Sequence, residues 1–171
     1  MKTTRSWMWM APLSLAVVAT AGGCACKYAV DECAGFDATA VEGPLAIGIT
    51  VPDRTLHPGE SFTVTAAVEN RGGTPVEVDA FGKTQLYVSA AHHTARGWEE
   101  IERSPAAAPQ VLHTTIIAPG EVLRASRTLT VGPTWPSNEV LRIRAWLNGR
   151  EDVNVSEFVE VAPRNKSWLG L

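Results

Sequence analysis

The sequence predicts an all-β protein in which one antiparallel sheet packs on another. Apolar and polar residues alternate with a period of two through seven or eight short segments, which is the pattern of half-buried strands. Turn signals built from Pro, Gly and Asn separate these segments at intervals of roughly 8 to 15 residues. No segment keeps a helical period for long. Such a chain closes its core by packing two sheets face to face.

The first two strands are predicted at residues 45–51 and 61–70. Large apolar side chains occupy every second position of the first strand, with small residues between them on the other face. Pro58-Gly59 marks the turn between the strands, because Pro presets the second turn position and Gly accepts the positive φ of the third. Each strand therefore presents one face to the core.

The middle of the chain predicts two shorter strands, at residues 76–81 and 85–90, after a Gly-rich turn at residues 70–75. Residues 92–109 mix a short strand around Trp98 with a loop rich in Ala and Pro. Their pattern leaves the conformation of this segment open.

The last part of the chain predicts four strands, at residues 110–117, 122–131, 140–148 and 153–161. The apolar set of the second of these is Leu123, Ala125, Leu129 and Val131. Asn148-Gly149 predicts a tight hairpin of the primed type between the last two strands. In the final strand the period slips between Val155 and Phe158, which predicts a bulge there.

The first 23 residues read as an export signal. Lys2 and Arg5 precede an uncharged run from Trp7 to Ala21, and small residues follow. A helix needs about 20 apolar residues to span a bilayer, so this run of 15 favours a signal over a transmembrane helix. Residues 24–171 are then the exported chain.

Ala21-Gly22-Gly23-Cys24 resembles the lipobox of bacterial lipoproteins. The resemblance implies that Cys24 receives a diacylglycerol, that the signal is cut before it, and that the new amino group is acylated, with palmitate expected. Ala25 then implies transfer to an outer membrane, facing the periplasm or the exterior, if the cell has one. The alternative is an ordinary signal cut near Ala21 or Gly23, which leaves Cys24 free or in a disulfide.

Cys26 and Cys33 are the other two cysteines, and an oxidising compartment favours a disulfide between them. Both lie in residues 24–44, which keep no period and predict a tether from the membrane to the body. Tyr28 and Phe36 offer this tether a way to dock on the body. The predicted organisation is therefore a signal at residues 1–23, a tether, a body at residues 45–163 and a tail at residues 164–171.

The body resembles the bacterial immunoglobulin-like modules of exported proteins in the order of HPGESFTVTAAVENRGGTPVEV, IIAPGEVLRASRTLTV and VLRIRAWLN. It is also similar in layout to small bacterial proteinase inhibitors of the intracellular-inhibitor type. The first resemblance implies an immunoglobulin-like antiparallel β-sandwich of seven or eight strands. Neither resemblance transfers a functional residue.

Charge argues against a nucleic-acid partner. The chain has 15 Lys and Arg against 18 Asp and Glu, and Lys2 and Arg5 lie in the signal, so residues 24–171 carry a net charge of −5. A nucleic-acid-binding domain normally shows a basic patch. The partners expected are instead the membrane, through the lipid, and another envelope protein.

No catalytic, cofactor or metal site is predicted. The chain has four histidines: His57, His92, His93 and His113. A zinc site needs three or four converging ligands, whereas His92 and His93 point to opposite faces if they lie in a strand. Glu99, Glu100 and Glu102 predict a solvated edge rather than a pair of catalytic carboxylates.

Two tryptophans are candidate binding residues. Trp135 lies in a loop between Pro133 and Pro136, where it can anchor an interface or fold back over the open end of the sandwich. Trp146 is predicted to face outward from the strand at residues 140–148, where the apolar tail can cover it.

The expected function is that of a lipid-anchored, non-catalytic envelope protein whose sandwich is a binding or structural module. The alternative is a proteinase inhibitor that presents one loop of the sandwich, either residues 132–139 or residues 92–109. Rigidity from proline favours such a role, because it lowers the entropy lost on binding.

Overall fold

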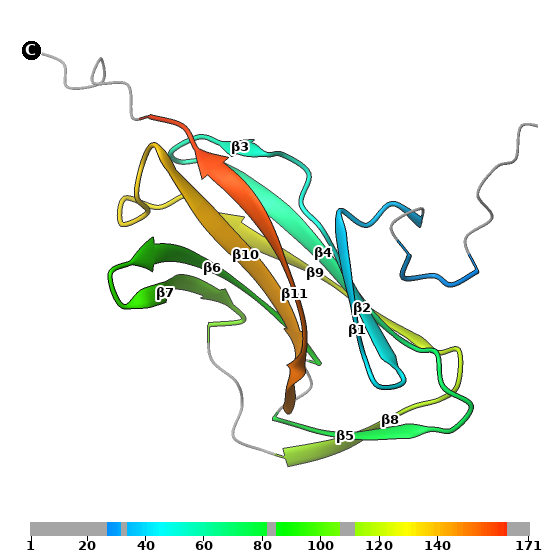
Figure 1. Cartoon of the computed structure of the whole chain (residues 1–171). Coiled ribbons are helices and arrows are strands. Elements are labelled where there is room, and N and C mark those ends of the chain that lie inside the picture. Colours follow the sequence, from blue (N-terminus) through cyan, green and yellow to red (C-terminus); the bar gives the residue numbers. More distant parts are fainter. Residues whose placement is uncertain (1–26, 32–33, 82–84, 107–111, 164–171) are drawn as a thin grey trace, which may run out of the picture.

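The computed structural model describes residues 27–31, 34–81, 85–106 and 112–163 (Figure 1). The described residues form eleven strands and no α-helix, which confirms the all-β class. The strands are β1 (Ala38–Glu42), β2 (Leu45–Thr50), β3 (Thr55–Leu56), β4 (Ser61–Asn70), β5 (Val76–Phe81), β6 (Leu86–Thr94), β7 (Gly97–Ser104), β8 (Leu112–Ile117), β9 (Val122–Thr130), β10 (Glu139–Leu147) and β11 (Arg150–Val161).

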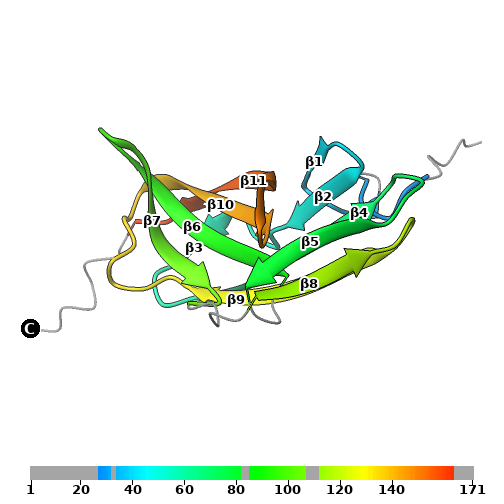
Figure 2. The same ribbon diagram turned by 90° about the horizontal axis from the view of Figure 1, so that it is seen from below.

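Two larger sheets and one ribbon make up the described fold. The four-stranded sheet has the order β1-β2-β4-β9, and the five-stranded sheet has the order β3-β11-β10-β6-β7. β5 and β8 lie side by side as a separate two-stranded ribbon (Figure 2). The arrangement is consistent with a β-sandwich, because β1 and β2 of one sheet contact β11 of the other.

The core lies between the two larger sheets, and the strands that line it contribute every second side chain to it. β10 shows the pattern most clearly, because Leu141, Ile143, Ala145 and Leu147 are fully buried in this core. β2, β4 and β9 supply its opposite wall, with Ile47, Val64 and Leu129 among the buried residues. The strands predicted at residues 61–70, 122–131 and 140–148 are thus confirmed as β4, β9 and β10.

The prediction of seven or eight strands is wrong, because three further strands lack a readable pattern. β3 is only two residues long and pairs in parallel with the end of β11. β7 runs through the segment whose conformation was left open, and its alternation is broken at Ile101, which has no partner on β6. β1 is five residues long and contains only one large apolar side chain, Val41, which is exposed.

β1 also corrects the tether predicted at residues 24–44. All five residues of β1 pair with β2, from Ala38 opposite Ile49 to Glu42 opposite Leu45. The residues before β1 are also packed: Val30 and Phe36 are buried against Ala46 and Ala67, in a cluster separate from the main core. This cluster covers the outer face of the four-stranded sheet, so the folded body begins well before residue 45.

Polar contacts hold the segment at residues 27–31 on this outer face. The buried carboxylate of Glu69 accepts hydrogen bonds from the backbone N–H groups of Ala29 and Val30, at 3.3 and 3.0 Å. The guanidinium of Arg71 donates to the Val30 carbonyl and to the Asp31 carboxylate, and its Nε lies 3.5 Å from Glu69. We call residues 27–31 and 34–37, with Glu69 and Arg71, the N-terminal clamp.

Gly48 on β2 is the position on which Val30 and Phe36 of the N-terminal clamp pack. A Cβ atom at this position would lie 2.7 Å from Cγ of Phe36 and 2.8 Å from Cγ1 of Val30. Real side chains do not approach so closely, so only glycine permits this contact between β2 and the clamp. β2 is consequently buried on both faces, although its sequence predicted one solvated face.

Asn70 joins β4 to the ribbon of β5 and β8. Its buried side chain donates from Nδ2 to the carbonyls of Thr74 and Ile117, at 2.9 and 2.8 Å, and accepts from the N–H of Gly72 at 2.9 Å. The side chain thus holds the turn after β4 against the end of β8. Each of its polar atoms has a partner, as burial requires.

The bulge predicted between Val155 and Phe158 is absent. β11 pairs regularly with β10 through this region, and the register shifts nearer the hairpin, between Trp146 and Leu147. The slip in the apolar pattern has another cause: Glu157 takes an inward position, where it forms an ion pair with Arg54, and Phe158 points outward. A polar residue thus takes an inward position and an apolar residue takes an outward one, while the backbone of β11 stays regularly paired.

Candidate functional site: an aromatic face on the five-stranded sheet

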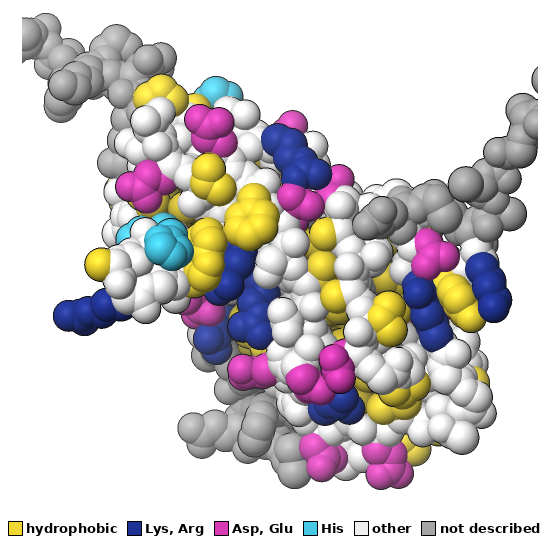
Figure 3. Space-filling view, in the orientation of Figure 1, with side chains coloured by type: hydrophobic (Ala, Val, Ile, Leu, Met, Phe, Trp, Pro, Cys, Tyr) yellow, Lys and Arg dark blue, Asp and Glu magenta, His cyan; other side chains and the backbone are white. Residues whose placement is uncertain are grey.

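Exposed apolar side chains gather on the outer face of the five-stranded sheet. Among the described residues, the exposed large hydrophobics are Val41, Trp98, Ile116, Val140 and Phe158. Trp98, Val140 and Phe158, which are 36%, 55% and 48% exposed, come from β7, β10 and β11 and share this one face. Figure 3 shows hydrophobic and histidine side chains beside arginines in this part of the molecule.

The strand register brings these side chains together. Arg142 on β10 lies opposite Phe158 on β11, and His93 on β6 lies opposite Trp98 on β7. The Arg142 guanidinium lies over the Trp98 ring, with Cζ 4.7 Å from its centroid. The Trp98 and Phe158 centroids are 5.8 Å apart, and the His93 ring meets Trp98 edge-on at 5.3 Å. We call His93, Trp98, Val140, Arg142 and Phe158 the aromatic face.

Arg142 is the cation at the centre of the aromatic face. Burial lowers the pKa of its guanidinium, and the nearby positive charge of Arg144 lowers it further. The group nevertheless stays charged at neutral pH, because its ordinary pKa is far above 7. Its Nε is buried and has no hydrogen-bond partner among the described residues, so stacking on Trp98 is its main contact.

Trp146 lies on the same outer face, but other side chains cover it. Its ring stacks on Tyr87 at 5.5 Å and 21°, and the guanidinium groups of Arg103 and Arg144 lie 5.4 Å from its centroid. Only 6% of Trp146 is exposed, so its prediction as a binding residue is corrected. The tail that was expected to cover it, residues 164–171, lies outside the described residues.

Trp135 is buried, which corrects its prediction as an interface anchor. It is 3% exposed, meets the Phe62 ring edge-on at 6.1 Å and donates from Nε1 to the Glu102 carboxylate at 3.1 Å. Trp135 thus takes the alternative position weighed from the sequence, folded back against the sandwich. The loop at residues 132–139, one of the two considered for an inhibitor, carries this tryptophan inward.

Glu102 is not part of a solvated edge, and a bulge in β7 explains why. Glu100 lies opposite Ala91 and Glu102 lies opposite Ala90, so Ile101 is the extra residue between them. In a regular strand Glu100 and Glu102 would share a face. The bulge turns Glu102 inward toward Trp135, while Glu100 stays outside and pairs with Arg103.

The described histidines do not converge. His92 and His93 lie on β6, His113 lies on β8, and His57 lies between β3 and β4. The His92 imidazole lies 4.0 Å from the carboxylate of Glu99 and 4.0 Å from that of Glu139, so its polar neighbours are two surface carboxylates. In the part of the chain that the structure describes, no three His, Cys, Asp or Glu residues are grouped so as to hold a metal ion.

The predicted lipid and disulfide sites lie outside the described residues, since these do not include Cys24, Cys26 or Cys33. Within residues 27–31, 34–81, 85–106 and 112–163, no helix has the length and apolar character needed to cross a membrane. The predictions for the three cysteines therefore stay predictions.

Sequence reasoning missed the aromatic face, although one signal was available. Phe158 breaks the inward alternation of β11, and an aromatic residue out of phase in a regular strand is an outward-facing one. Trp98 gave no such signal, because the pattern around the short strand there did not show which face each residue takes. The fold and this surface together describe an all-β domain with an exposed cluster of aromatic and arginine side chains.

No protein-family model and no curated protein sequence matches the chain. Among solved structures, Spo0M, a sporulation control protein from Bacillus subtilis, is 15% identical with a TM-score of 0.45, over 72% of this chain and 51% of that one. A cycloisomaltooligosaccharide glucanotransferase from Paenibacillus sp. is 14% identical with a TM-score of 0.43, over 68% and 14% of the two chains. The alkylpurine DNA glycosylase AlkC from Pseudomonas fluorescens is 11% identical with a TM-score of 0.46, over 70% and 30%.

The chain thus spans about half the length of Spo0M and less than a third of the two enzymes. These similarities transfer no activity, substrate or partner to it.

Proposed function

We propose that the protein is a lipid-anchored component of a bacterial cell envelope whose domain binds another envelope protein without catalysis. The aromatic face carries the proposal. Aromatic residues and arginine are enriched in the parts of protein interfaces that supply most of the binding energy. A cluster of Trp, Phe, Val and Arg on the outer face of a sheet therefore suits a protein partner.

We further propose that the domain is an immunoglobulin-like sandwich, and the strand order supports this. In the immunoglobulin plan, strands A, B, E and D form one sheet and strands C, F and G form the other. Here β2, β4 and β9 lie together, and β6, β10 and β11 lie together in the facing sheet. The chain also changes sheets between β9 and β10, as Greek-key connections do.

Replacing Cys24 with serine is expected to release the protein from the membrane, because serine cannot carry the thioether-linked lipid. The measurement is fractionation of cells into membrane and soluble protein, combined with the intact mass of the extracted chain. The wild-type protein should begin at Cys24 and be heavier by the mass of the acyl and glyceryl groups. Cys26→Ser is the control and should stay in the membrane. A soluble wild-type chain without added mass contradicts the anchor.

The doubly substituted protein Trp98→Ala, Phe158→Ala is expected to lose its envelope partner. The wild type and the variant are crosslinked mildly in membranes, extracted with detergent and compared by quantitative mass spectrometry. The expected result is at least a tenfold loss of one captured protein, since two interface anchors are removed. Val41→Ala, Ile116→Ala is the matched control, because it removes two apolar side chains from other strands that are more exposed than Trp98 and Phe158. Equal capture by all three proteins contradicts the proposed interface.

A further inference from the structure

Arg127 occupies a core-facing position of β9. The inward row of this strand runs through Leu123, Ala125, Leu129 and Val131, and Arg127 falls in the same row between Ala125 and Leu129. A charge in such a row is costly unless it has partners. We therefore expect Arg127 to have a role in binding rather than in core packing.

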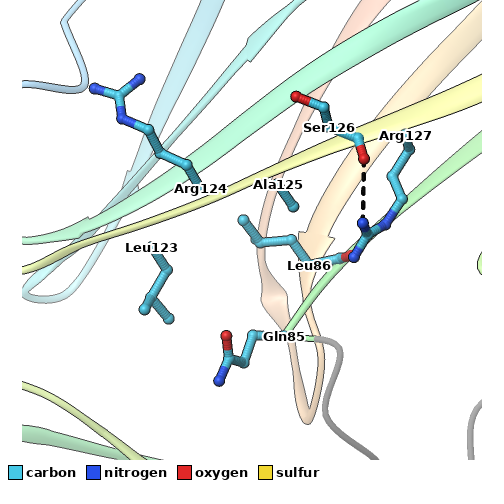
Figure 4. Close-up of a pocket in the computed structure, with 7 residues that line it drawn as sticks. All are labelled: Gln85, Leu86, Leu123, Arg124, Ala125, Ser126 and Arg127. Carbon is cyan, nitrogen blue, oxygen red and sulfur yellow. Dashed lines mark hydrogen bonds between the residues drawn. The ribbon is translucent and has the colours of Figure 1, made fainter.

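The Arg127 side chain lines a pocket between β9 and the start of β6. Gln85, Leu86, Leu123 and Ala125 line the same pocket, whose volume is about 350 Å³. Figure 4 shows these side chains coming from the two segments around a common space, while Arg124 points away from it. The walls thus combine aliphatic groups with one amide and the Arg127 guanidinium, and Arg124 and Ser126 complete the lining.

The partners of Arg127 are neutral and weak. Its Nη1 donates to the carbonyl of Ser126 at 3.1 Å, and its Nη2 donates to the carbonyl of Leu86 at 3.3 Å (Figure 4). Its Nε is buried and has no hydrogen-bond partner among the described residues, and no described carboxylate forms an ion pair with it. The guanidinium keeps donor capacity for a carboxylate, its preferred bidentate partner.

β9 is also the last strand of its sheet. β4 pairs with one side of β9, and no described strand pairs with the other side. Toward the end of β9, the Thr130 N–H points to the Glu102 carboxylate at 3.5 Å, so β7 covers that part of the edge. Beside the pocket, at residues 122–127, the described contact to β6 is made by the Arg127 guanidinium, which joins the Ser126 carbonyl to the Leu86 carbonyl, and no described strand pairs with the backbone there. Edge strands of this kind accept a further strand through their backbone groups.

We infer that the β9 edge binds an extended segment of a partner protein by strand addition, with an Asp or Glu side chain of that segment in the pocket against Arg127. The inference rests on the proposed binding function but uses a surface other than the aromatic face. A second copy of this chain fits less well, because pairing of two β9 strands would bring Arg124 and Arg127 of both copies together. The complementary charge comes from an acidic segment.

The test is selection of a display library of random ten-residue peptides on the full-length protein in detergent micelles. Enriched peptides are expected to carry one acidic residue among β-branched neighbours. Replacing that residue by its amide is expected to weaken binding at least tenfold, as is methylation of an adjacent peptide nitrogen. The amide-peptide measurement needs no protein variant, so it holds even if substitutions at Arg127 impair folding.

Arg127→Gln in the protein is expected to cause the same tenfold loss, whereas Arg124→Gln, on the other face of the same strand, is the matched control and should bind normally. Amide hydrogen exchange of residues 122–127 should slow when the peptide binds. No enrichment of acidic peptides, or equal binding by wild type and Arg127→Gln, overturns the inference. Trp98→Ala, Phe158→Ala should keep peptide binding, so failure at the β9 edge is distinguishable from failure of the aromatic face.

Discussion

Replacing Trp135 with alanine is expected to lower the free energy of unfolding by about 3–5 kcal/mol. The indole is 3% exposed and packs edge-on against Phe62, so its removal leaves a cavity that the surrounding strands cannot fill. It also removes the donor that faces the Glu102 carboxylate. The measurement is urea denaturation at pH 7 followed by far-ultraviolet circular dichroism.

Two variants separate the contributions at Trp135. Trp135→Phe keeps an aromatic ring but lacks the Nε1–H group, so it should recover part of the loss and leave the cost of the missing hydrogen bond. Trp98→Ala removes the same side chain from an exposed position and is expected to cost less than about 1 kcal/mol. A loss at Trp135→Ala as small as that at Trp98→Ala would show that Trp135 does not seal the core.

Replacing Asn70 with aspartate is expected to cost about 3–5 kcal/mol at pH 7, although the two side chains have the same shape. The Nδ2 donor now satisfies the carbonyls of Thr74 and Ile117, and a carboxylate oxygen in its place would repel both. The position is fully buried, so water cannot relieve the charge. The measurement is the same denaturation experiment, with the wild type at each pH as reference.

The cost of Asn70→Asp should depend on pH in a defined direction. Burial raises the pKa of the introduced carboxyl in the folded state above its ordinary value of about 3.9, so the folded protein prefers the protonated form. The deficit relative to wild type is therefore smallest below about pH 4 and grows as the pH rises. Asn154→Asp is the matched control, since Asn154 also donates to two carbonyls but is only partly buried. A deficit independent of pH would contradict this account.

The sequence was sufficient to predict the strands that bury one face and expose the other. β4 and β10 carry a buried apolar side chain at every second position, and each was predicted within one or two residues. β1 was missed because its residues are mostly small and its stability comes from pairing with β2 rather than from its own apolar side chains. Gly48 appeared to be a small outward residue, and only the fold shows that Phe36 rests on it.

The functional surfaces were harder to predict because they depend on departures from regular alternation. The bulge at Ile101 turns Glu102 inward, and no feature of the residues around it marks that change. Phe158 and Trp98 are 60 residues apart in the sequence and meet only through the order β11-β10-β6-β7. The apolar set predicted for residues 122–131 gives Arg127 no role, whereas the structure places it beside a pocket.

The N-terminal clamp limits how far the domain can move from the proposed lipid anchor. The buried Val30 is six positions after Cys24, so the chain between the proposed lipid and Val30 spans at most about 20 Å when fully extended. The N-terminal clamp lies on the outer face of one sheet, and the aromatic face lies on the outer face of the other. A short connection that holds the clamp toward the bilayer therefore turns the aromatic face away from the bilayer. A partner anchored in the same membrane would then encounter the domain by lateral diffusion, at a high effective concentration. A partner anchored elsewhere would need a segment long enough to extend to the domain.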